Sequence, residues 1–248
     1  MEVIYIFWLR QIKRYIRSKP RFIGSLGQPV LFLIALGFGF GPIFEKAGGG
    51  NYIDFLTPGI IAQSILFTAA FAGVDLIFEK RFGFLKETLA APVSRVKIIL
   101  GRSLGSATIA TIQGTIVLFL SLLLGFRPFY FGRMFFSFGF MFILAFLFTL
   151  IGTSIAAVLD DVQAFQFVVN FLIMPLFFLS GALFPLASLP KIFKIIATIN
   201  PLTYGVDALR ACLVNVSHFG LLVDVSILVG LSVVFLGASC YSFSKIEV

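Results

Sequence analysis

Six stretches of the chain are apolar and long enough to cross a lipid bilayer, and no other feature constrains the fold as strongly. A helix needs about 20 predominantly apolar residues to span the hydrocarbon core. The expected spans are residues 22–44, 55–78, 98–125, 132–159, 164–184 and 219–243. Hydrophobic residues make up 59% of the 248-residue chain and charged residues only 12%, a balance that is extreme for a soluble domain. We therefore expect an all-α integral membrane domain over residues 22–248, with no soluble domain attached.

The first 21 residues follow a different, amphipathic pattern. Aromatic and aliphatic side chains recur at helical spacing, and basic side chains occupy the opposite face. The apolar positions are Tyr5, Trp8, Leu9, Ile12, Tyr15 and Ile16, and the basic positions are Arg10, Lys13, Arg14 and Arg17. This pattern is typical of a helix that lies in the membrane interface, and Pro20 should end it. A secretory signal is excluded, because no small-residue cleavage site follows.

The basic residues are distributed unevenly along the chain. The net charge is +8, and most of the 19 Lys and Arg residues precede the first expected span or lie near the connection between the second and third. Basic residues in short loops favour the cytoplasmic side. The pattern predicts six crossings of the plasma (inner) membrane with both termini in the cytoplasm. The short loop at Asp160 and Asp161 has no basic residue, but acidic residues contribute little to this rule.

A charged, helix-capable segment, residues 79–95, separates the second and third expected spans. Leu85, Leu89 and Val93 recur at every fourth position, so one helical face is predicted to rest on the membrane domain, with a break at Pro92. The side chains left for solvent or a partner are Glu79, Arg81, Lys86, Glu87 and Arg95. Two interpretations follow: a docking surface for a soluble protein, or a surface loop whose basic residues only set the orientation.

The stretch before the last span, residues 185–218, is too polar and broken to be a simple crossing. Residues 189–196 predict a short amphipathic helix, and residues 202–213 predict a second one with Asp207 and Arg210 on one face. Pro201 should separate the two helices, because the residue before a proline is disfavoured in helical geometry. We expect both helices to dip into the outer face of the membrane, where backbone must be helical or covered by protein.

No constellation of catalytic or metal-binding residues is recognisable in the sequence. The chain has no GxxxxGK[ST] nucleotide loop and no HExxH site. Its single histidine, His218, is expected to be a solvated loop residue. Cys212 and Cys240 lie far apart in the sequence, which argues against a disulfide or a metal site. The sequence therefore predicts a non-catalytic protein without a cofactor of its own.

Asp75 is the acid predicted to lie well inside a span, near the cytoplasmic end of the second one. Carboxylates inside a membrane are costly and often functional. One interpretation is a structural carboxylate at interface depth that pairs with Lys80 or Arg81. The other is a proton-coupled secondary transporter that uses Asp75, although the absence of inverted repeats argues against it.

Two segments resemble the membrane subunits of type-2 ATP-binding-cassette (ABC) exporters. Residues 78–95 are similar to that family's Glu-Arg/Lys…Gly…Glu…Leu…Ala/Thr-Pro-Val-Ser-Arg segment, with Lys80 at a place where the family often has Arg. Leu189-Pro190, followed by residues 199–210, resembles the family's second hallmark. The order of interface helix, spans and outer helices also fits. The Asn-Pro-Leu-Thr-Tyr form and the absence of a fused ATPase resemble the drug-resistance and nodulation-factor export branch.

The resemblance implies a permease subunit that pairs with a second copy or a paralogue and binds separate ABC ATPase subunits, which hold ATP and Mg. A coupling helix would sit in the ATPase. Its residues would be Glu79, Lys80, Arg81, Gly83, Phe84, Leu85, Lys86, Glu87, Thr88, Leu89, Ala91, Pro92, Val93, Ser94 and Arg95. Basic residues of the amino-terminal helix would contact the same partner. An outer motif would cap the exit: Asn200, Pro201, Leu202, Thr203, Tyr204, Asp207 and Arg210.

The resemblance also implies a translocation path along the first, second and fifth spans. Neutral polar residues at membrane depth either bridge helices or line such a path. The candidate path residues are Gln28, Gln63, Phe67, Phe71, Asn170 and Phe171. The implied substrate is a drug, a lipid or a glycolipid, and the alternative is a polysaccharide such as O-antigen or teichoic acid.

Overall fold

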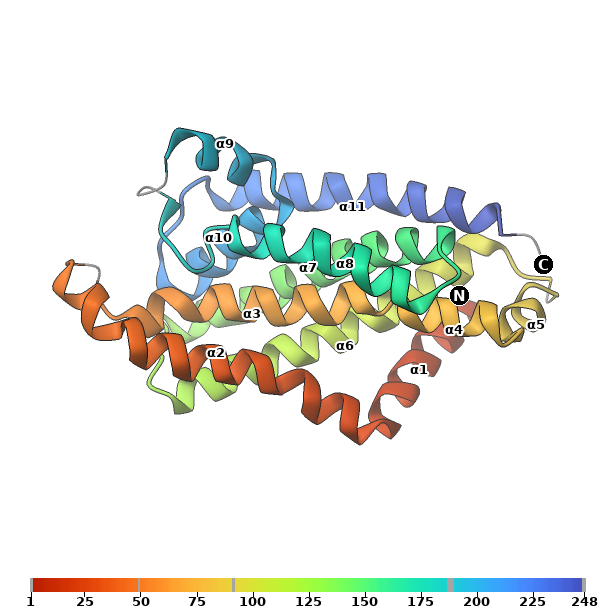
Figure 1. Ribbon diagram of the computed structural model, residues 1–248, viewed down its shortest axis with the longest axis horizontal. Coiled ribbons are helices and arrows are strands. Elements are labelled where there is room, and N and C mark those ends of the chain that lie inside the picture. The colour runs from red at the N-terminus through yellow and green to blue at the C-terminus, as the bar shows by residue number, and fades with distance from the viewer. Residues whose placement is uncertain (1, 49, 91, 187–189, 247–248) are drawn as a thin grey trace.

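The computed structural model describes residues 2–48, 50–90, 92–186 and 190–246, and the regular elements of these ranges are helices with no strand among them. The long helices run roughly side by side, and α1 crosses them at the end where α4 and α5 lie (Figure 1). The helices are α1 (Glu2–Arg17), α2 (Lys19–Lys46), α3 (Tyr52–Phe71), α4 (Val74–Arg81), α5 (Phe84–Ala90), α6 (Arg95–Leu123), α7 (Phe131–Val158), α8 (Val162–Phe178), α9 (Lys191–Ile199), α10 (Pro201–Val214) and α11 (Leu221–Ser244). The predicted all-α membrane architecture is confirmed.

Five continuous helical stretches of the described chain are long and apolar enough to cross a membrane. They are Phe22–Lys46, Tyr52–Arg81, Arg95–Leu123, Phe131–Val158 and Leu221–Ser244. The fifth expected span corresponds to α8, which is apolar but only 17 residues long. It stops at Phe178, before the expected end at residue 184, and Gly181 with a φ of +77° turns the chain soon afterwards.

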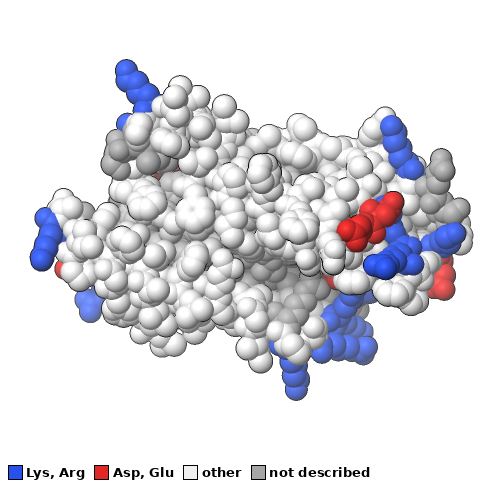
Figure 2. All heavy atoms as spheres, in the orientation of Figure 1, with Lys and Arg blue, Asp and Glu red and all other residues white. Residues whose placement is uncertain are grey.

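On the face that Figure 2 shows, charged side chains gather towards the two ends of the molecule and leave an uncharged band between them. The band contains the long apolar helices, whereas α4, α5 and the ends of α1 and α11 lie at one charged end (Figures 1 and 2). An uncharged band flanked by charges is the surface that a bilayer requires, because charge is costly in the hydrocarbon core. The molecule is therefore an integral membrane protein.

The second expected span is interrupted by a turn at Ala72 and Gly73, between α3 and α4, instead of forming one regular helix. Here the chain passes very close to α7: a Cβ atom at Gly73 would lie 2.5 Å from the carbonyl oxygen of Gly152. A Cβ at Gly152 would in turn overlap the carbonyl of Ala70. Small residues let membrane helices approach in this way, and the sequence pattern of α3 gave no sign of the contact.

Helix α1 packs along α6. A Cβ atom at Gly101 would lie 2.7 Å from the Ile4 carbonyl oxygen, and one at Gly105 would lie 2.7 Å from Cβ of Gln11. These two glycines, four residues apart, form the groove that receives α1. The amino-terminal residues Glu2–Arg17 are helical, but Pro20 stands in the first turn of α2 and not at the end of α1, a position that suits its fixed φ.

The two short helices predicted before the last span are present as α9 and α10. Asn200 separates them as expected, and Pro201 opens α10. The predicted residue Leu189 lies outside the described residues. Helix α10 is buried between α3, α7 and α11, whereas α9 presents an apolar face outward that includes Ile192 and Ile199.

We predict that Gly152→Ala lowers the free energy of unfolding by about 1–3 kcal/mol, because its methyl group enters a space already filled by α3. Gly139→Ala on the same helix is the matched control, since a Cβ there meets no atom within 4 Å. The control should be neutral or more stable by up to about 1 kcal/mol, because Ala favours helix. Thermal unfolding of both variants in lipid nanodiscs measures the difference. Equal melting temperatures would contradict the close contact.

Candidate functional site

The charged segment forms two helices, α4 and α5, and not the single helix over residues 79–95 that the sequence suggested. Gly83 turns the chain between them with a φ of +78°, a conformation that glycine adopts without a steric penalty. Pro92 follows α5, and Ser94 precedes α6. Ala91 lies outside the described residues. The turn at Gly83 directs α5 away from the axis of α3 and α4 (Figure 1).

Glu79 faces inward, although the sequence placed it among the side chains left for solvent or a partner. Glu79 is only 3% exposed to solvent, and its carboxylate contacts three guanidinium groups. Oε1 accepts a hydrogen bond of 3.0 Å from Arg10 and another of 3.0 Å from Arg14, and Oε2 pairs with the buried Arg102. A buried carboxylate needs such compensation. We call these four residues the Glu79 cluster; it joins α1, α4 and α6.

Two further ion pairs fix the same end of the bundle. Asp75 pairs with Arg14 at 2.8 Å, so its partner differs from the predicted Lys80 or Arg81. Lys80 instead reaches the end of α7, where its Nζ donates to the carbonyl oxygen of Ala157 at 3.1 Å and pairs with Asp160 at 2.5 Å. A cation is favoured at a helix carboxyl end. The short Asp160 loop, which lacks basic residues of its own, therefore receives its cation from α4.

The spacing of Leu85, Leu89 and Val93 correctly predicted which face of residues 79–95 packs against the rest of the protein. Leu85 is buried, and Leu89 and Val93 pack against the hydrophobic core. Arg95 is not free for a partner, since its guanidinium donates to the carbonyl oxygens of Phe243 and Ser244. Ala90, Pro92 and Ser94 are exposed, and the larger side chains that remain exposed are Arg81, Phe82, Phe84, Lys86 and Glu87. We call these five residues the α5 surface.

The basic residues of α1 fall into two groups. Arg10 and Arg14 have side chains 40% and 36% exposed and are engaged by the Glu79 cluster. Lys13 and Arg17 are exposed and stand on the surface of the same end of the molecule. Arg102, which the sequence analysis did not single out, is the buried partner of Glu79. Its position within the expected span 98–125 is the signal that could have revealed it.

Residues of the outer motif form the buried amino-terminal cap of α10. The Oδ1 of Asn200 accepts a hydrogen bond of 3.0 Å from the amide of Leu202, and its Nδ2 donates to the carbonyl oxygen of Leu176 at 2.6 Å. The hydroxyl of Tyr204 donates to the carbonyl oxygen of Thr198 at 2.6 Å. Asn is among the preferred caps of helices, and these contacts join α8, α9 and α10.

Asp207 and Arg210 share a helix but bind different parts of the backbone. Asp207 accepts hydrogen bonds from the amides of His218 and Phe219, each at 2.8 Å. Arg210 donates to the carbonyl oxygen of Gly181 at 3.2 Å and lies 4.1 Å above the Phe55 ring. Burial lowers the pKa of Arg210 to about 10, against the opposing effect of Asp207, so the guanidinium stays charged at neutral pH. His218 is exposed, as expected.

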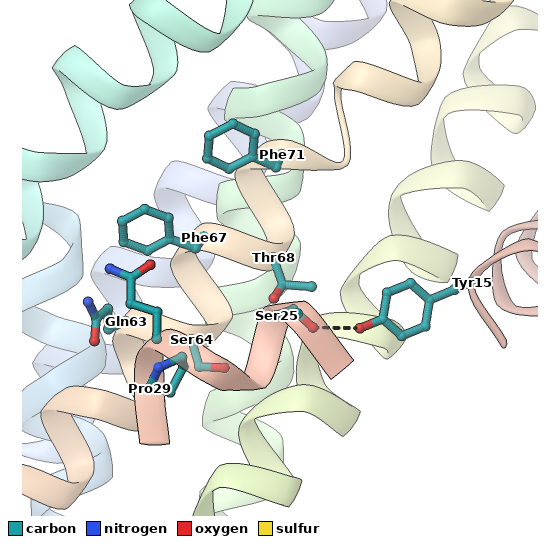
Figure 3. Close-up of a pocket in the computed structure, with 10 residues that line it drawn as sticks. Tyr15, Ser25, Pro29, Gln63, Ser64, Phe67, Thr68 and Phe71 are labelled. Atoms are coloured by element: carbon teal, nitrogen blue, oxygen red, sulfur yellow. Dashed lines mark hydrogen bonds between the residues drawn. The ribbon is translucent and has the colours of Figure 1, made fainter. Parts of the chain in front are cut away.

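Four of the six candidate path residues meet in one cavity of about 230 Å³. Gln28 comes from α2, and Gln63, Phe67 and Phe71 come from α3 (Figure 3). The sequence analysis did not assign the other polar residues of this cavity, which are Tyr15, Ser25, Ser64 and Thr68. Ser64 and Thr68 lie one helical turn apart in an apolar span, a pattern that could have revealed them.

The other two candidate path residues lie elsewhere. Asn170 is exposed on α8 and does not line the cavity. Phe171 is 84% exposed and lines a separate groove of about 360 Å³ with residues of α8 and α9. Within one chain, therefore, the first and second spans form a shared cavity and α8 does not contribute to it.

An apolar helical bundle, a polar cavity between its first spans and a charged helical end define the class of protein: an integral membrane protein with an internal polar cavity. A family model described as ABC-2 type transporter matches residues 2–214. The chain therefore belongs to the ABC-2 type transporter family. This confirms the resemblance that the two sequence segments suggested.

Individual relatives agree with the family. The chain is similar to the protein named Putative transport permease ycf38 of Cyanophora paradoxa, with 32% identity over 213 residues that cover 80% of this chain and 71% of the relative. A protein of the same name from Pyropia yezoensis is 33% identical over 78% of this chain and 68% of its own length. Nodulation protein J of Sinorhizobium fredii (strain NBRC 101917 / NGR234) is 26% identical over 83% of this chain and 79% of its own length.

We predict that Glu79→Gln destabilises the protein by about 3–5 kcal/mol, because it leaves the buried Arg102 without a counter-charge. Glu79→Asp, which keeps the charge, should recover part of the loss. Glu87→Gln on the exposed α5 surface is the matched control and should change stability by less than about 0.5 kcal/mol. Thermal unfolding in nanodiscs compares the three variants, and an unchanged melting temperature for Glu79→Gln would refute the role of the cluster.

Proposed function

We propose that this chain is the membrane subunit of an ATP-driven exporter, in which two permease copies bind two separate ATPase subunits. The observation that carries the proposal is the way α4 and α5 are attached. Their inner side is fixed to α1, α6 and α7 by the Glu79 cluster and by Lys80, whereas the α5 surface presents two aromatic rings and three charges outward. A partner that moves this surface would move three helices of the bundle with it.

The chemistry of the α5 surface suits a soluble protein partner. Phe82 is 66% exposed and Phe84 is 55% exposed, and the charged Lys86 and Glu87 are close to them in the sequence. Protein interfaces commonly combine aromatic anchors with a polar rim. Exposed Lys13 and Arg17 of α1 extend the same end of the molecule. We infer that the ATPase binds here and that ATP and Mg are held by the ATPase and not by this chain.

The proposed topology has six crossings of the plasma membrane and both termini in the cytoplasm. In this arrangement α8, with the residues that follow it to residue 184, serves as the fifth crossing, and α9 and α10 cap the exit from the outer side. The support is the excess of basic residues around α1, α4 and α5. The burial of α10 against three other helices fits a rigid cap.

Pairing of two copies is supported by the helices that the single chain leaves least covered. The apolar parts of α2 and α11 are each only 17% buried, and α8 exposes Phe167 and Phe171 at 76% and 84%. In the proposed dimer α2 and α8 border a path between the copies, and substrate enters sideways from the inner leaflet. The proposed substrate is a drug, a lipid or a glycolipid, with a polysaccharide as the alternative.

No observation favours proton-coupled transport through Asp75. Its ion pair with Arg14 suits a structural carboxylate at the membrane interface, as one of the two interpretations of the sequence held. Membership of the ABC-2 family points the same way.

We predict that Glu87→Arg, tested with the co-expressed ATPase subunit, lowers transport and substrate-stimulated ATP hydrolysis by about tenfold or more. A reversed charge at a docking surface costs at least about 1.4 kcal/mol, which is one factor of ten. Glu45→Arg is the control. It reverses an exposed charge at the carboxyl end of α2, away from α5, and should retain both activities. Thermal unfolding verifies that both variants fold.

The proposal fails if Glu87→Arg transports normally, or if vesicles that hold the permease without any ATPase still move solute. The first result would show that the ATPase does not dock on the α5 surface. The second would show that transport is not driven by ATP hydrolysis.

A further inference from the structure

The cavity between α1, α2 and α3 contains polar groups that the protein leaves without partners. Gln63 is 2% exposed, and neither atom of its side-chain amide has a hydrogen-bond partner among the described residues. Ser64, also 2% exposed, has an unpartnered hydroxyl. Buried polar groups are nearly always satisfied, since an unmade hydrogen bond is costly. An unsatisfied amide and hydroxyl beside a cavity indicate that something else supplies their partners.

Polar side chains and aromatic rings line the cavity together. Gln63, Phe67 and Phe71 stand on successive turns of α3 (Figure 3), and the two rings are stacked with centroids 6.3 Å apart. Opposite them, the Tyr15 hydroxyl donates to Oε1 of Gln113 at 3.1 Å and lies within hydrogen-bond distance, 3.2 Å, of the Ser25 hydroxyl. Tyr15 therefore has a fixed orientation. The cavity offers a preformed set of hydrogen-bonding groups above an aromatic wall.

The charge of the cavity limits its ligand. The described residues that line it include no Lys, Arg, Asp or Glu, and its polar groups are amides and hydroxyls from Tyr15, Ser25, Gln28, Gln63, Ser64 and Thr68. An ionised group would lose its hydration here without gaining a counter-charge. A neutral group with several hydroxyls or amides can instead exchange its hydrogen bonds with water for bonds to these side chains.

The size and depth of the cavity limit the ligand further. Sites for drug-sized ligands measure about 300–1,000 Å³, so a cavity of about 230 Å³ suits one headgroup rather than a whole amphiphile. Its α2 residues, from Gly24 to Pro29, follow Lys19 by five to ten residues, which corresponds to roughly 8–15 Å along a helix. In the proposed topology this is the depth of the inner leaflet.

We propose that this cavity binds the uncharged, hydroxyl- or amide-bearing headgroup of an amphipathic molecule whose apolar tail stays in the bilayer. The inference deepens the proposed function, on which it depends only in calling that molecule the exported substrate. Gln63 supplies a donor and an acceptor to the headgroup, Ser64 adds a hydroxyl, and Phe67 and Phe71 cover its apolar side. The cavity does not bind amphiphiles that have the same apolar tail but a charged headgroup.

The test uses the full chain in nanodiscs without ATPase and a dodecyl glucoside that carries a diazirine in its tail. Light-induced labelling should map to α2 and α3 and be displaced by dodecyl glucoside, but not by dodecyl sulfate or dodecyltrimethylammonium. Gln63→Leu should weaken binding by about tenfold, equivalent to about 1.4 kcal/mol and thus to one or two hydrogen bonds. Its melting temperature should not fall, because the lost amide had no protein partner.

A matched control and a second variant keep the test decisive. Thr149→Val on α7 removes another buried, unpartnered hydroxyl away from the cavity and should leave binding unchanged. Ser64→Ala should weaken binding less than Gln63→Leu, and it serves as the main variant if Gln63→Leu does not fold. Equal binding to both Gln63→Leu and the wild type, or equal displacement by the charged amphiphiles, overturns the inference.

The binding assay also separates this inference from the proposed function. Since no ATPase is present, selective binding persists even if ATP-driven export is disproved. Conversely, ATP-driven export that is insensitive to Gln63→Leu and Ser64→Ala overturns the headgroup site and leaves the exporter in place.

Discussion

The buried carboxylate of Glu79 is the contact on which the charged end of the molecule depends. It binds Arg10 and Arg14 of α1 and Arg102 of α6, so a single side chain joins three helices. A carboxylate in this position is stable only while the surrounding cations compensate for its lost hydration. Because the buried Arg102 would be left as an uncompensated charge if Glu79 moved away, α4 and α6 are held in one arrangement.

The same arrangement links the surface of α5 to the interior of the bundle. Arg14 belongs to the Glu79 cluster and also pairs with Asp75, which follows the cavity-lining part of α3 by only a few residues. Tyr15, the next residue of α1, lines the cavity. The docking surface that we propose and the headgroup site that we infer are therefore connected through α1 and α4. A contiguous set of packed and ion-paired elements is the physical requirement for coupling between two sites.

Local features of the fold were predictable from the sequence to a large extent. Leu85, Leu89 and Val93 were expected to face the core, and they do; Asn200 was expected to separate two short outer helices, and it caps the second. Of the six candidate path residues, Gln28, Gln63, Phe67 and Phe71 line one cavity, and Asn170 and Phe171 do not. Four features were not predicted: the inward direction of Glu79, the ion-pair partner of Asp75, the turn at Gly73 and the short length of α8. Each of these depends on contacts with distant parts of the chain.

The sequence by itself determined that the chain is helical and membrane-embedded, because apolar length and helical periodicity are properties of neighbouring residues. Only the tertiary structure decided which charges face a partner and which face inward. Arg102 is 23 residues from Glu79 and Arg10 is 69 residues away, so no local pattern could bring them together. A charged side chain in a sequence looks the same whether water or an opposite charge surrounds it, and the packing of α1 and α6 around α4 makes that choice.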